Sequence, residues 1–382
     1  MINYGRQYID SDDVKAVLRV LKSDWLTQGP QIQKFENSLK AYFNSNYCTV
    51  LSSGTAALHL AVLTLGWNKE DIIITTPISF LATSNCILYC GATPSFVDIE
   101  SKYFTIDVEK LEQKIKLFKK REKKIVGIIA TDYAGHPCDW KSLRKIADRY
   151  GLKLINDNCH ALGAQIDNDK GYAVKYADIV TQSYHPVKNI TTGEGGSILT
   201  NNKHLDKKIK NLRTHGIDQS TRGLWSYEMK DLGFNYRISD IQCALGTSQL
   251  KKLNVFLKKR EKIAKSYNNH FQKVENFFIP KVKKENKHAY HLYPLRIDFN
   301  KFGINKKSLF KYLVIKGVKP QVHYIPIHLQ QFYRKKFNFK KGDFPISEKF
   351  YNEEVSLPIY FSLKESEIDF IATSITNFFR KK

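Results

Sequence analysis

Between residues 48 and 200, short apolar segments alternate with amphipathic ones, and this alternation limits the possible folds more than any other feature. Apolar segments of strand length stand at 48–51, 72–75, 94–97, 125–130, 153–156, 178–182 and, after a Gly-rich turn, 195–200. The amphipathic stretches between them include 54–65, 107–117 and 140–150. Strands and helices that alternate in this way predict an α/β domain with a mostly parallel sheet.

The rest of the chain predicts an N-terminal arm and a second, smaller domain. After the arm, Ser11 precedes two acidic residues, which indicates a helix start with a capping hydroxyl, and apolar residues follow with helical period. The stretch 237–271 predicts one long helix between the domains. The tail predicts an α+β domain, with strands near 289–297 and 318–324 and helices near 306–316 and 364–379. We therefore divide the chain into residues 1–250 and residues 251–382.

The composition argues against several classes of protein. A net charge of +24 is compatible with a polyanionic partner, but the lysine-rich runs stand on helix-like stretches without an RNA-binding aromatic motif or a helix-turn-helix pattern. We interpret the charge as solvated helix faces, with phosphate-bearing small substrates as a compatible alternative. We expect no nucleic-acid partner, and no membrane partner because no apolar run approaches the length of a membrane span.

The six cysteines are scattered and form no CxxC pair, so we predict no metal site. Scattered cysteines in a chain whose first residues do not resemble a secretory or transit signal favour the reducing cytoplasm.

Three segments carry the residue types of a cofactor site. In Leu51–Leu58 a strand ends, small residues form a turn and a helix begins. The free N–H groups at the start of a helix suit a phosphate. A plain capped helix without a ligand is the alternative. A later strand ends at Asp157, with His160 close behind. Acids at strand ends of an α/β sheet often face a ligand, although an N-cap is the alternative here. Residues 183–196 form a loop rich in Gly and hydroxyl residues around Lys188.

Together, the three segments fit pyridoxal 5'-phosphate. This cofactor needs a phosphate cradle, a carboxylate that keeps its pyridine nitrogen protonated, and a lysine that binds it as a Schiff base. Asp157 offers the carboxylate and Lys188 the amine. Once an amino donor displaces that amine, it can move protons as a general base and a general acid.

The chain resembles the DegT-type sugar aminotransferases. The resemblance covers nearly the whole chain and rests on the segments 26–30, 53–58, 157–163, 183–196 and 233–237. It implies the type I fold of pyridoxal-phosphate enzymes, with a three-layer α/β/α large domain around a mostly parallel sheet and a smaller C-terminal α+β domain. It also implies that residues 1–250 bind the cofactor and that the enzyme is a homodimer with shared active sites.

Four further segments resemble a narrower group within this family, whose members aminate C4 of a UDP-linked 4-keto-6-deoxy-N-acetylhexosamine in pseudaminic acid synthesis. These segments are 75–83, 132–135, 185–192 and 321–324. The resemblance implies L-glutamate as the donor, a UDP-keto-sugar (UDP-2-acetamido-2,6-dideoxy-β-L-arabino-hex-4-ulose) as the acceptor, and a role in surface glycan synthesis. A C3- or C4-transaminase of a dTDP- or GDP-linked keto sugar is the alternative. A non-enzymatic regulatory or polyanion-binding protein on the same fold is a remote one.

The resemblance also implies a role for each site residue. Lys188 is expected to be the Schiff-base lysine and the catalytic acid–base group, and Asp157 to bind the pyridine nitrogen. Phe80 is expected to stack on the ring, although an aromatic residue more often packs in a core. The phosphate is expected to contact Gly54, Thr55 and Ser183, together with Asn235 of the other subunit. His160 is expected to lie near the phenolic oxygen. The residues expected to contact the substrate are Tyr236, Arg237, His323 and Tyr324. Some relatives have His in place of this Lys and remove a sugar hydroxyl instead, so Lys188 favours transamination.

Overall fold

The computed structural model describes residues 1–218 and 223–380, and its centre is a seven-stranded sheet in the order β2-β9-β8-β6-β5-β3-β4. The strands are β2 (Tyr47–Leu51), β3 (Ile72–Thr75), β4 (Thr93–Phe96), β5 (Ile125–Thr131), β6 (Lys153–Asp157), β8 (Ile179–Ser183) and β9 (Gly196–Thr200). Neighbouring strands are parallel except for the two pairs that contain β9. The predicted α/β fold with a mostly parallel sheet is confirmed, and each strand agrees with its predicted segment to within about a residue at either end.

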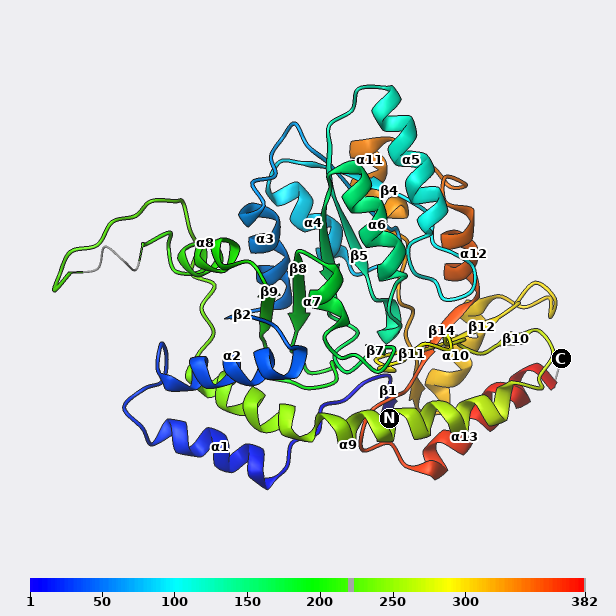
Figure 1. Ribbon diagram of the computed structural model, residues 1–382. Helices are drawn as coiled ribbons and strands as arrows, with labels where there is room; N and C mark the ends of the chain where they lie inside the picture. Colours follow the sequence, from blue (N-terminus) through cyan, green and yellow to red (C-terminus); the bar gives the residue numbers. More distant parts are fainter. Residues whose placement is uncertain (219–222, 381–382) are drawn as a thin grey trace.

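Helices cover both faces of this sheet and make three layers (Figure 1). One face carries α2 (Pro30–Phe43), α5 (Val108–Lys120), α6 (Trp140–Tyr150) and α7 (Tyr172–Tyr176), and the other carries α3 (Gly54–Thr64), α4 (Leu81–Tyr89) and α8 (Lys203–Arg213). Ile73 and Ile155 belong to the core beside α3, whereas their neighbours Ile74 and Leu154 belong to the core beside α6. Successive strand side chains point to opposite faces, so a sheet covered on both sides needs continuous apolar runs.

A long helix, α9 (Asp240–Phe271), connects this sheet to a second core, as predicted. Leu253 and Phe256 of α9 pack in the first core, and Tyr267 and Phe271 pack in the second. The second core surrounds the antiparallel strands β10 (Phe277–Phe278), β12 (Tyr293–Ile297) and β14 (Glu354–Leu357), with α10 (Lys306–Ile315) and α13 (Glu365–Arg380). The domain boundary after residue 250 stays a prediction, and it falls inside α9.

Several short elements complete the fold. They are β7 (Gln165–Ile166), which pairs with β11 (Asn286–Lys287), the 3-10 turns η1 (Tyr133–Gly135) and η3 (Ile327–Leu329), and the helices α11 (Gln331–Phe337) and α12 (Pro345–Glu353).

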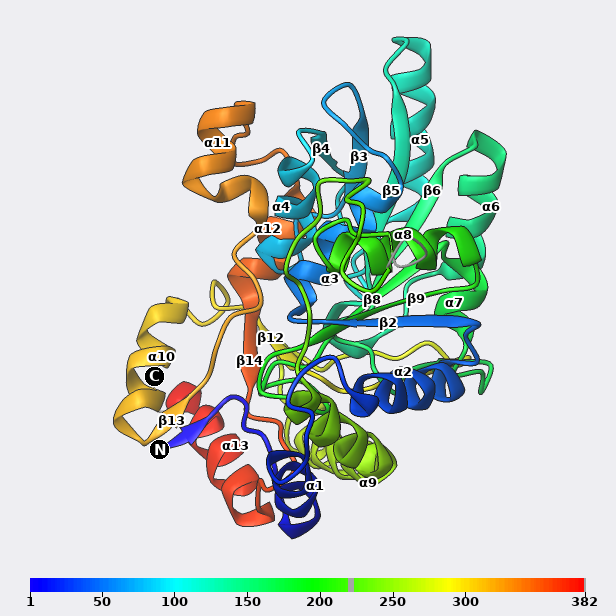
Figure 2. The ribbon, with the colours of Figure 1, turned by 90° about the vertical axis from the view of Figure 1, so that its left-hand side faces the viewer.

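The N-terminal arm lies against the C-terminal part of the chain. β1 (Ile2–Asn3) pairs in parallel with β13 (Val318–Lys319), as Figure 2 shows. The Tyr4 ring then contacts His323, with 5.1 Å between the ring centroids. The predicted strand over 318–324 is therefore wrong beyond Lys319, because the chain leaves the strand there and continues as an irregular segment.

The first helix, α1 (Ser11–Leu21), differs from its prediction at its start. The N-cap is Asp10, whose carboxylate accepts hydrogen bonds from two following amides, and not Ser11. Ala16 and Val20 are buried, and α1 packs on α9, but three larger apolar side chains of this helix are exposed: Val14, Leu18 and Leu21.

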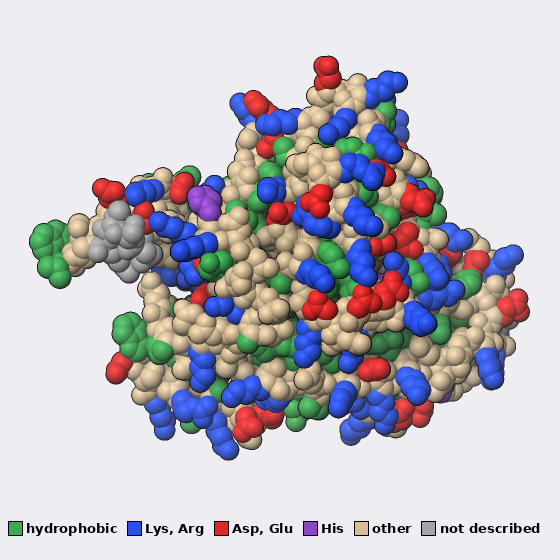
Figure 3. All heavy atoms as spheres, viewed as in Figure 1, with side chains coloured by type: hydrophobic (Ala, Val, Ile, Leu, Met, Phe, Trp, Pro, Cys, Tyr) green, Lys and Arg blue, Asp and Glu red, His purple; other side chains and the backbone are tan. Residues whose placement is uncertain are grey.

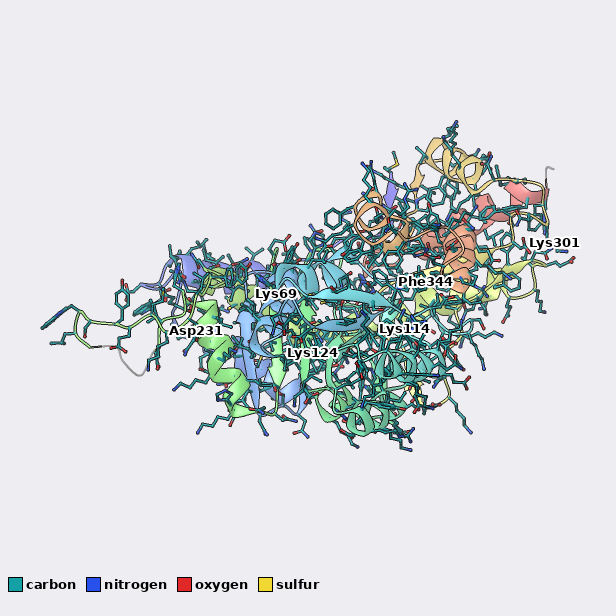
Figure 4. The ribbon with its side chains drawn as sticks, turned by 90° about the horizontal axis from the view of Figure 1, so that it is seen from above. Lys69, Lys114, Lys124, Asp231, Lys301 and Phe344 are labelled. Atoms are coloured by element: carbon teal, nitrogen blue, oxygen red, sulfur yellow. The ribbon has the colours of Figure 1, made fainter. Side chains whose placement is uncertain are left out.

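Described residues between α8 and α9, on either side of positions 219–222, project from the body of the molecule (Figure 1). Seen from above, Asp231 on this segment and Lys301 lie on opposite sides of the protein (Figure 4). Its described residues include apolar side chains that are almost fully exposed, with Leu224 at 98% and Trp225 at 86%, and Figure 3 shows this hydrophobic tip.

On the face shown in Figure 3, Lys and Arg side chains are interspersed with acidic ones. Within the described ranges, no helix combines the length and the apolar character that crossing a membrane requires.

Candidate active site

A cavity of about 640 Å³ lies at the carboxyl ends of β6 and β8, between the large sheet and the irregular segment that follows β13. Of the twelve predicted site residues, all except Asn235, Tyr236 and Arg237 line this cavity. The nine that line it are Gly54, Thr55, Phe80, Asp157, His160, Ser183, Lys188, His323 and Tyr324. Ligands of open α/β sheets bind at this edge, because strand ends and helix starts meet there.

The start of α3 forms a cradle with free hydrogen-bond donors. Ser53 caps the helix by accepting a hydrogen bond from the Ala56 N–H at 3.1 Å. The N–H groups of Gly54 and Thr55 have no protein partner among the described residues. A Cβ at Gly54 would lie 2.7 Å from the Ser183 Cβ, so only glycine lets the helix start approach the end of β8 this closely. Free amides at a helix start beside the Ser183 hydroxyl fit a phosphate group.

Asp157 ends β6 as a buried carboxylate with a fixed orientation. Its Oδ2 accepts hydrogen bonds from the Thr83 hydroxyl at 2.5 Å and the Thr131 hydroxyl at 3.5 Å, and its Oδ1 accepts one from the Cys159 N–H at 3.3 Å. Thr83 was not recognised as a site residue from the sequence. No local pattern connects it with Asp157, which lies 74 residues away along the chain.

Phe80 stands at the N-cap of α4 and is 54% exposed. Its ring faces the cavity beside Tyr324, with 5.9 Å between the two ring centroids. Packing of Phe80 in a core, the alternative expected of a bare aromatic residue, is therefore wrong. An exposed ring on a cavity wall suits stacking on a flat ligand.

Lys188 lies in the loop between β8 and β9. The loop is closed by two backbone hydrogen bonds, Tyr184 N–H to the Gly195 oxygen at 2.9 Å and Thr192 N–H to the Tyr184 oxygen at 3.0 Å. Burial lowers the pKa of Lys188, against the opposing effects of Cys159 and Asp157. A lowered pKa increases the fraction of neutral amine, which is the nucleophilic form.

Three buried histidines surround Lys188. Burial lowers the pKa of His160 and of His291, and it lowers the pKa of His323 to about 3, with the positive charge of Lys188 acting in the same direction. All three are therefore neutral near pH 7. His291 was not recognised from the sequence, where nothing separates it from a core histidine.

The proton of His160 is placed by its neighbours. Its Nδ1 accepts a hydrogen bond from the Ala134 N–H at 3.3 Å, so the proton is on Nε2, which lies 3.0 Å from the Tyr324 hydroxyl oxygen. Nε2–H donates to that oxygen, and the Tyr324 hydroxyl proton is left to donate into the cavity.

The three predicted residues outside the cavity lie on the stretch that leads into α9. Asn235 is exposed. Tyr236 lies outside the cavity as well, because its hydroxyl is 3.1 Å from the Nδ1 of His59 and its ring stacks on Phe234. One copy of the chain therefore does not bring these residues to its own cavity.

The cavity fits pyridoxal phosphate. It offers free amides and a hydroxyl to the phosphate, the carboxylate of Asp157 to a ring nitrogen, the exposed face of Phe80 to the ring, and the amine of Lys188.

Comparison with known proteins gives a consistent result. Residues 7–376 match the profile described as the DegT/DnrJ/EryC1/StrS aminotransferase family. A Campylobacter jejuni protein (subsp. jejuni serotype O:23/36, strain 81-176) described as UDP-4-amino-4,6-dideoxy-N-acetyl-beta-L-altrosamine transaminase is 38% identical over 383 residues, which cover 100% of this chain and 98% of that protein.

Two solved structures share the fold over their full length. Helicobacter pylori PseC, described as an aminotransferase involved in the biosynthesis of pseudoaminic acid, is 34% identical, with a TM-score of 0.91 and 100% of each chain covered. A putative sugar aminotransferase from Streptococcus pneumoniae is 26% identical in its PLP-form, with a TM-score of 0.90 and coverage of 99% of this chain and 98% of that one.

Proposed function

Because this chain belongs to the DegT/DnrJ/EryC1/StrS aminotransferase family, we propose that it moves the amino group of L-glutamate to C4 of a UDP-linked 4-keto-6-deoxy-N-acetylhexosamine. The product is a UDP-4-amino-4,6-dideoxy sugar for pseudaminic acid synthesis. The observation that carries the sugar assignment is the 38% identity, over the whole chain, with a protein described as that transaminase. The enzyme is an aminotransferase, and its cofactor is pyridoxal phosphate.

The cavity residues take the roles that the chemistry requires. When bound, pyridoxal phosphate withdraws electrons from the carbon that carries the amino group, which makes a proton on that carbon acidic. Lys188 removes this proton and returns one at the neighbouring position. Asp157 holds the positive charge on the ring nitrogen, and Thr83 keeps its carboxylate in place. Gly54, Thr55 and Ser183 hold the phosphate, and Phe80 covers the ring.

The remaining cavity residues orient the reactants. We place His160 near the phenolic oxygen of the ring, where Tyr324 holds its Nε2–H, and we assign Tyr324 to the substrate. His323 lies beside Tyr324 on the wall opposite the sheet and contacts the sugar nucleotide. Burial lowers the pKa of both His160 and His323, so both histidines offer neutral rings to the reactants.

A half-reaction tests the proposal. The purified protein, loaded with pyridoxal phosphate, is treated with L-glutamate, freed of glutamate and then given UDP-2-acetamido-2,6-dideoxy-β-L-arabino-hex-4-ulose. We expect glutamate to remove the visible absorbance of the cofactor and the keto sugar to restore it, because the amino group passes to the cofactor and then to C4.

Loss of the absorbance without its return would contradict the sugar assignment and leave the aminotransferase assignment standing. A set of dTDP- and GDP-linked keto sugars, offered to the same glutamate-treated protein, then identifies the acceptor. No response to L-glutamate would contradict the donor assignment.

A homodimer with shared sites explains the residues that one chain leaves outside its own cavity. Asn235 is exposed, and the same projecting segment carries the exposed apolar residues Leu224 and Trp225. We assign Asn235 to the cofactor phosphate of the partner subunit, and Tyr236 and Arg237 to the substrate there.

All six cysteines are free, which fits our expectation that the enzyme works in the cytoplasm.

Mixing two inactive variants tests the shared site. Lys188→Ala removes the amine from a protomer's own cavity, and Asn235→Ala removes the phosphate donor that it offers to its partner. Each variant alone is expected to lose most activity at limiting cofactor. An equal mixture, unfolded and refolded together, is expected to recover about one quarter of the wild-type activity, because half of the dimers are mixed and one site in each is intact. A mixture as inactive as its components would contradict the assignment of Asn235 to the partner's site.

A further inference from the structure

His323 is held from behind by two fully buried residues of β14, Glu354 and Ser356. The Nδ1 of His323 lies 2.8 Å from the Ser356 hydroxyl, and the Ser356 hydroxyl is hydrogen-bonded to Oε1 of Glu354. The backbone N–H of His323 donates to the other carboxyl oxygen of Glu354, Oε2, at 3.0 Å. Three side chains are thus linked in series from a buried carboxyl group to a residue of the substrate cavity.

Strand geometry explains why these two residues act together. Residues two apart on a strand point to the same face, so Glu354 and Ser356 share one face of β14 while Val355 and Leu357 enter the second hydrophobic core. The backbone groups of Gln321 and Ser356 exchange two hydrogen bonds of 3.2 and 2.8 Å, which hold the segment with His323 against β14. The backbone pairing therefore fixes the positions from which the side chains of Glu354, Ser356 and His323 meet.

We propose that Glu354, acting through Ser356, is a positioning residue that sets which ring nitrogen of His323 carries the proton, and so whether His323 donates or accepts a hydrogen bond in the substrate cavity. This inference rests on the proposed function, because it takes the sugar nucleotide as the ligand that His323 meets.

The direction of each hydrogen bond follows from the charge of Glu354. When Glu354 is ionised, it can only accept, so Ser356 donates to it and accepts from Nδ1–H of His323, and Nε2 faces the cavity as an acceptor. When Glu354 is neutral, its proton is on Oε1, because Oε2 accepts the His323 backbone N–H. Ser356 then accepts from Glu354 and donates to Nδ1, and Nε2–H becomes a donor. Nε2 has no protein partner among the described residues, which leaves it available to a ligand.

The charged and titratable groups that face Glu354 are Lys306 from α10, Tyr133 from η1, and His323 and Tyr324 from the segment after β13. Burial raises the pKa of Glu354 to about 8, against the opposing effects of the Ser356 hydrogen bond and the positive charge of Lys306. Below that pH Glu354 is neutral and His323 offers a donor, which suits the oxygen-rich phosphates and carbonyls of a sugar nucleotide. Above it, His323 becomes an acceptor, and binding of such a ligand weakens.

The test compares pH profiles. In Glu354→Gln, the amide oxygen takes the His323 N–H and the amide NH2 donates to Ser356, so the series is locked in its donor state. For the UDP-4-keto sugar, wild-type kcat/KM is expected to fall about tenfold from pH 7 to pH 9, and that of Glu354→Gln less than about threefold. Ser356→Ala breaks the series and is expected to flatten the profile as well. The control is Glu353→Gln, whose carboxylate pairs with Arg296 at 2.9 Å and does not contact His323. Its profile is expected to keep the wild-type shape.

An alkaline fall of equal size in wild type and Glu354→Gln overturns the proposal. Histidine-selective 15N NMR of the resting wild-type protein is a second test that needs no folded variant at position 354. The His323 signals, assigned by their loss in His323→Gln, are expected to move from the Nε2–H to the Nδ1–H form as the pH rises through about 8. An unchanged tautomer overturns the proposal without reference to the substrate. If the wild type turns over no UDP-keto-sugar at any pH while the NMR transition is present, the proposed substrate is wrong and the Glu354–His323 series stands.

Discussion

Replacing Lys188 by alanine is expected to reduce transamination by about 10⁴-fold or more, because the variant loses both the amine that binds the cofactor and the group that moves the proton. The cavity offers no substitute at that place. The three buried histidines around Lys188 are neutral, and they are held by other side chains or by packing. Steady-state rates with L-glutamate and the keto sugar measure the loss.

A chemical readout separates this loss from misfolding. Borohydride reduction of the loaded wild type, followed by peptide mass spectrometry, is expected to find the cofactor attached at Lys188 and to find no attachment in the variant. Lys188→Arg is expected to be as inactive as the alanine variant, since a guanidinium stays charged and cannot act as a neutral amine. Lys203→Ala, which removes an exposed lysine at the start of α8, is the control and is expected to keep wild-type rates. Substantial turnover in Lys188→Ala would refute the assignment.

Replacing Asp157 by asparagine is expected to lower kcat by about 10³-fold, because the side chain keeps its shape but loses the charge that keeps the ring nitrogen protonated. The Asn oxygen can still accept the hydrogen bond from Thr83, so the effect reports the charge rather than a collapse of the site. Steady-state kinetics at saturating cofactor measure it, and the absorption spectrum of the bound cofactor reports the protonation of its ring.

Two companion variants calibrate this result. Thr83→Val removes the hydroxyl that orients Asp157 and is expected to lower kcat by about tenfold, in line with one hydrogen bond to a charged group. Asp148→Asn changes a carboxylate on the outer surface of α6 and is expected to leave kcat unchanged. Equal rates for Asp157→Asn and the wild type would show that Asp157 does not hold the ring nitrogen.

The large sheet and the central site residues could be predicted from the sequence because their signals are local. A strand of the central sheet is a continuous apolar run, and Asp157 and Ser183 directly follow two such runs. Parallel strands bring their carboxyl ends to one edge, so residues that follow different strands meet there with Lys188 in the adjoining loop. The long helix α9 could be predicted as well, since apolar residues recur with helical spacing over many turns.

The contacts that orient these residues depend on packing between distant parts of the chain. Thr83 can donate to Asp157 only because the first turn of α4 packs next to the end of β6. Glu354 can accept from the His323 N–H only because β14 packs against the irregular segment after β13. The predicted strand over 318–324 ends at Lys319 because the segment pairs first with the N-terminal arm and then, through a single bridge, with β14. It does not pair with one neighbouring strand along its whole length.

The sequence by itself determined the order of strands and helices and the identity of the reactive groups, because both depend on residues that are close together along the chain. The tertiary structure alone decided which hydroxyl orients Asp157, where the proton of His160 resides, and that the strand expected over 318–324 stops at Lys319. Hydrogen bonds and burial are set by distances in space, and residues dozens of positions apart come within those distances only when the elements pack.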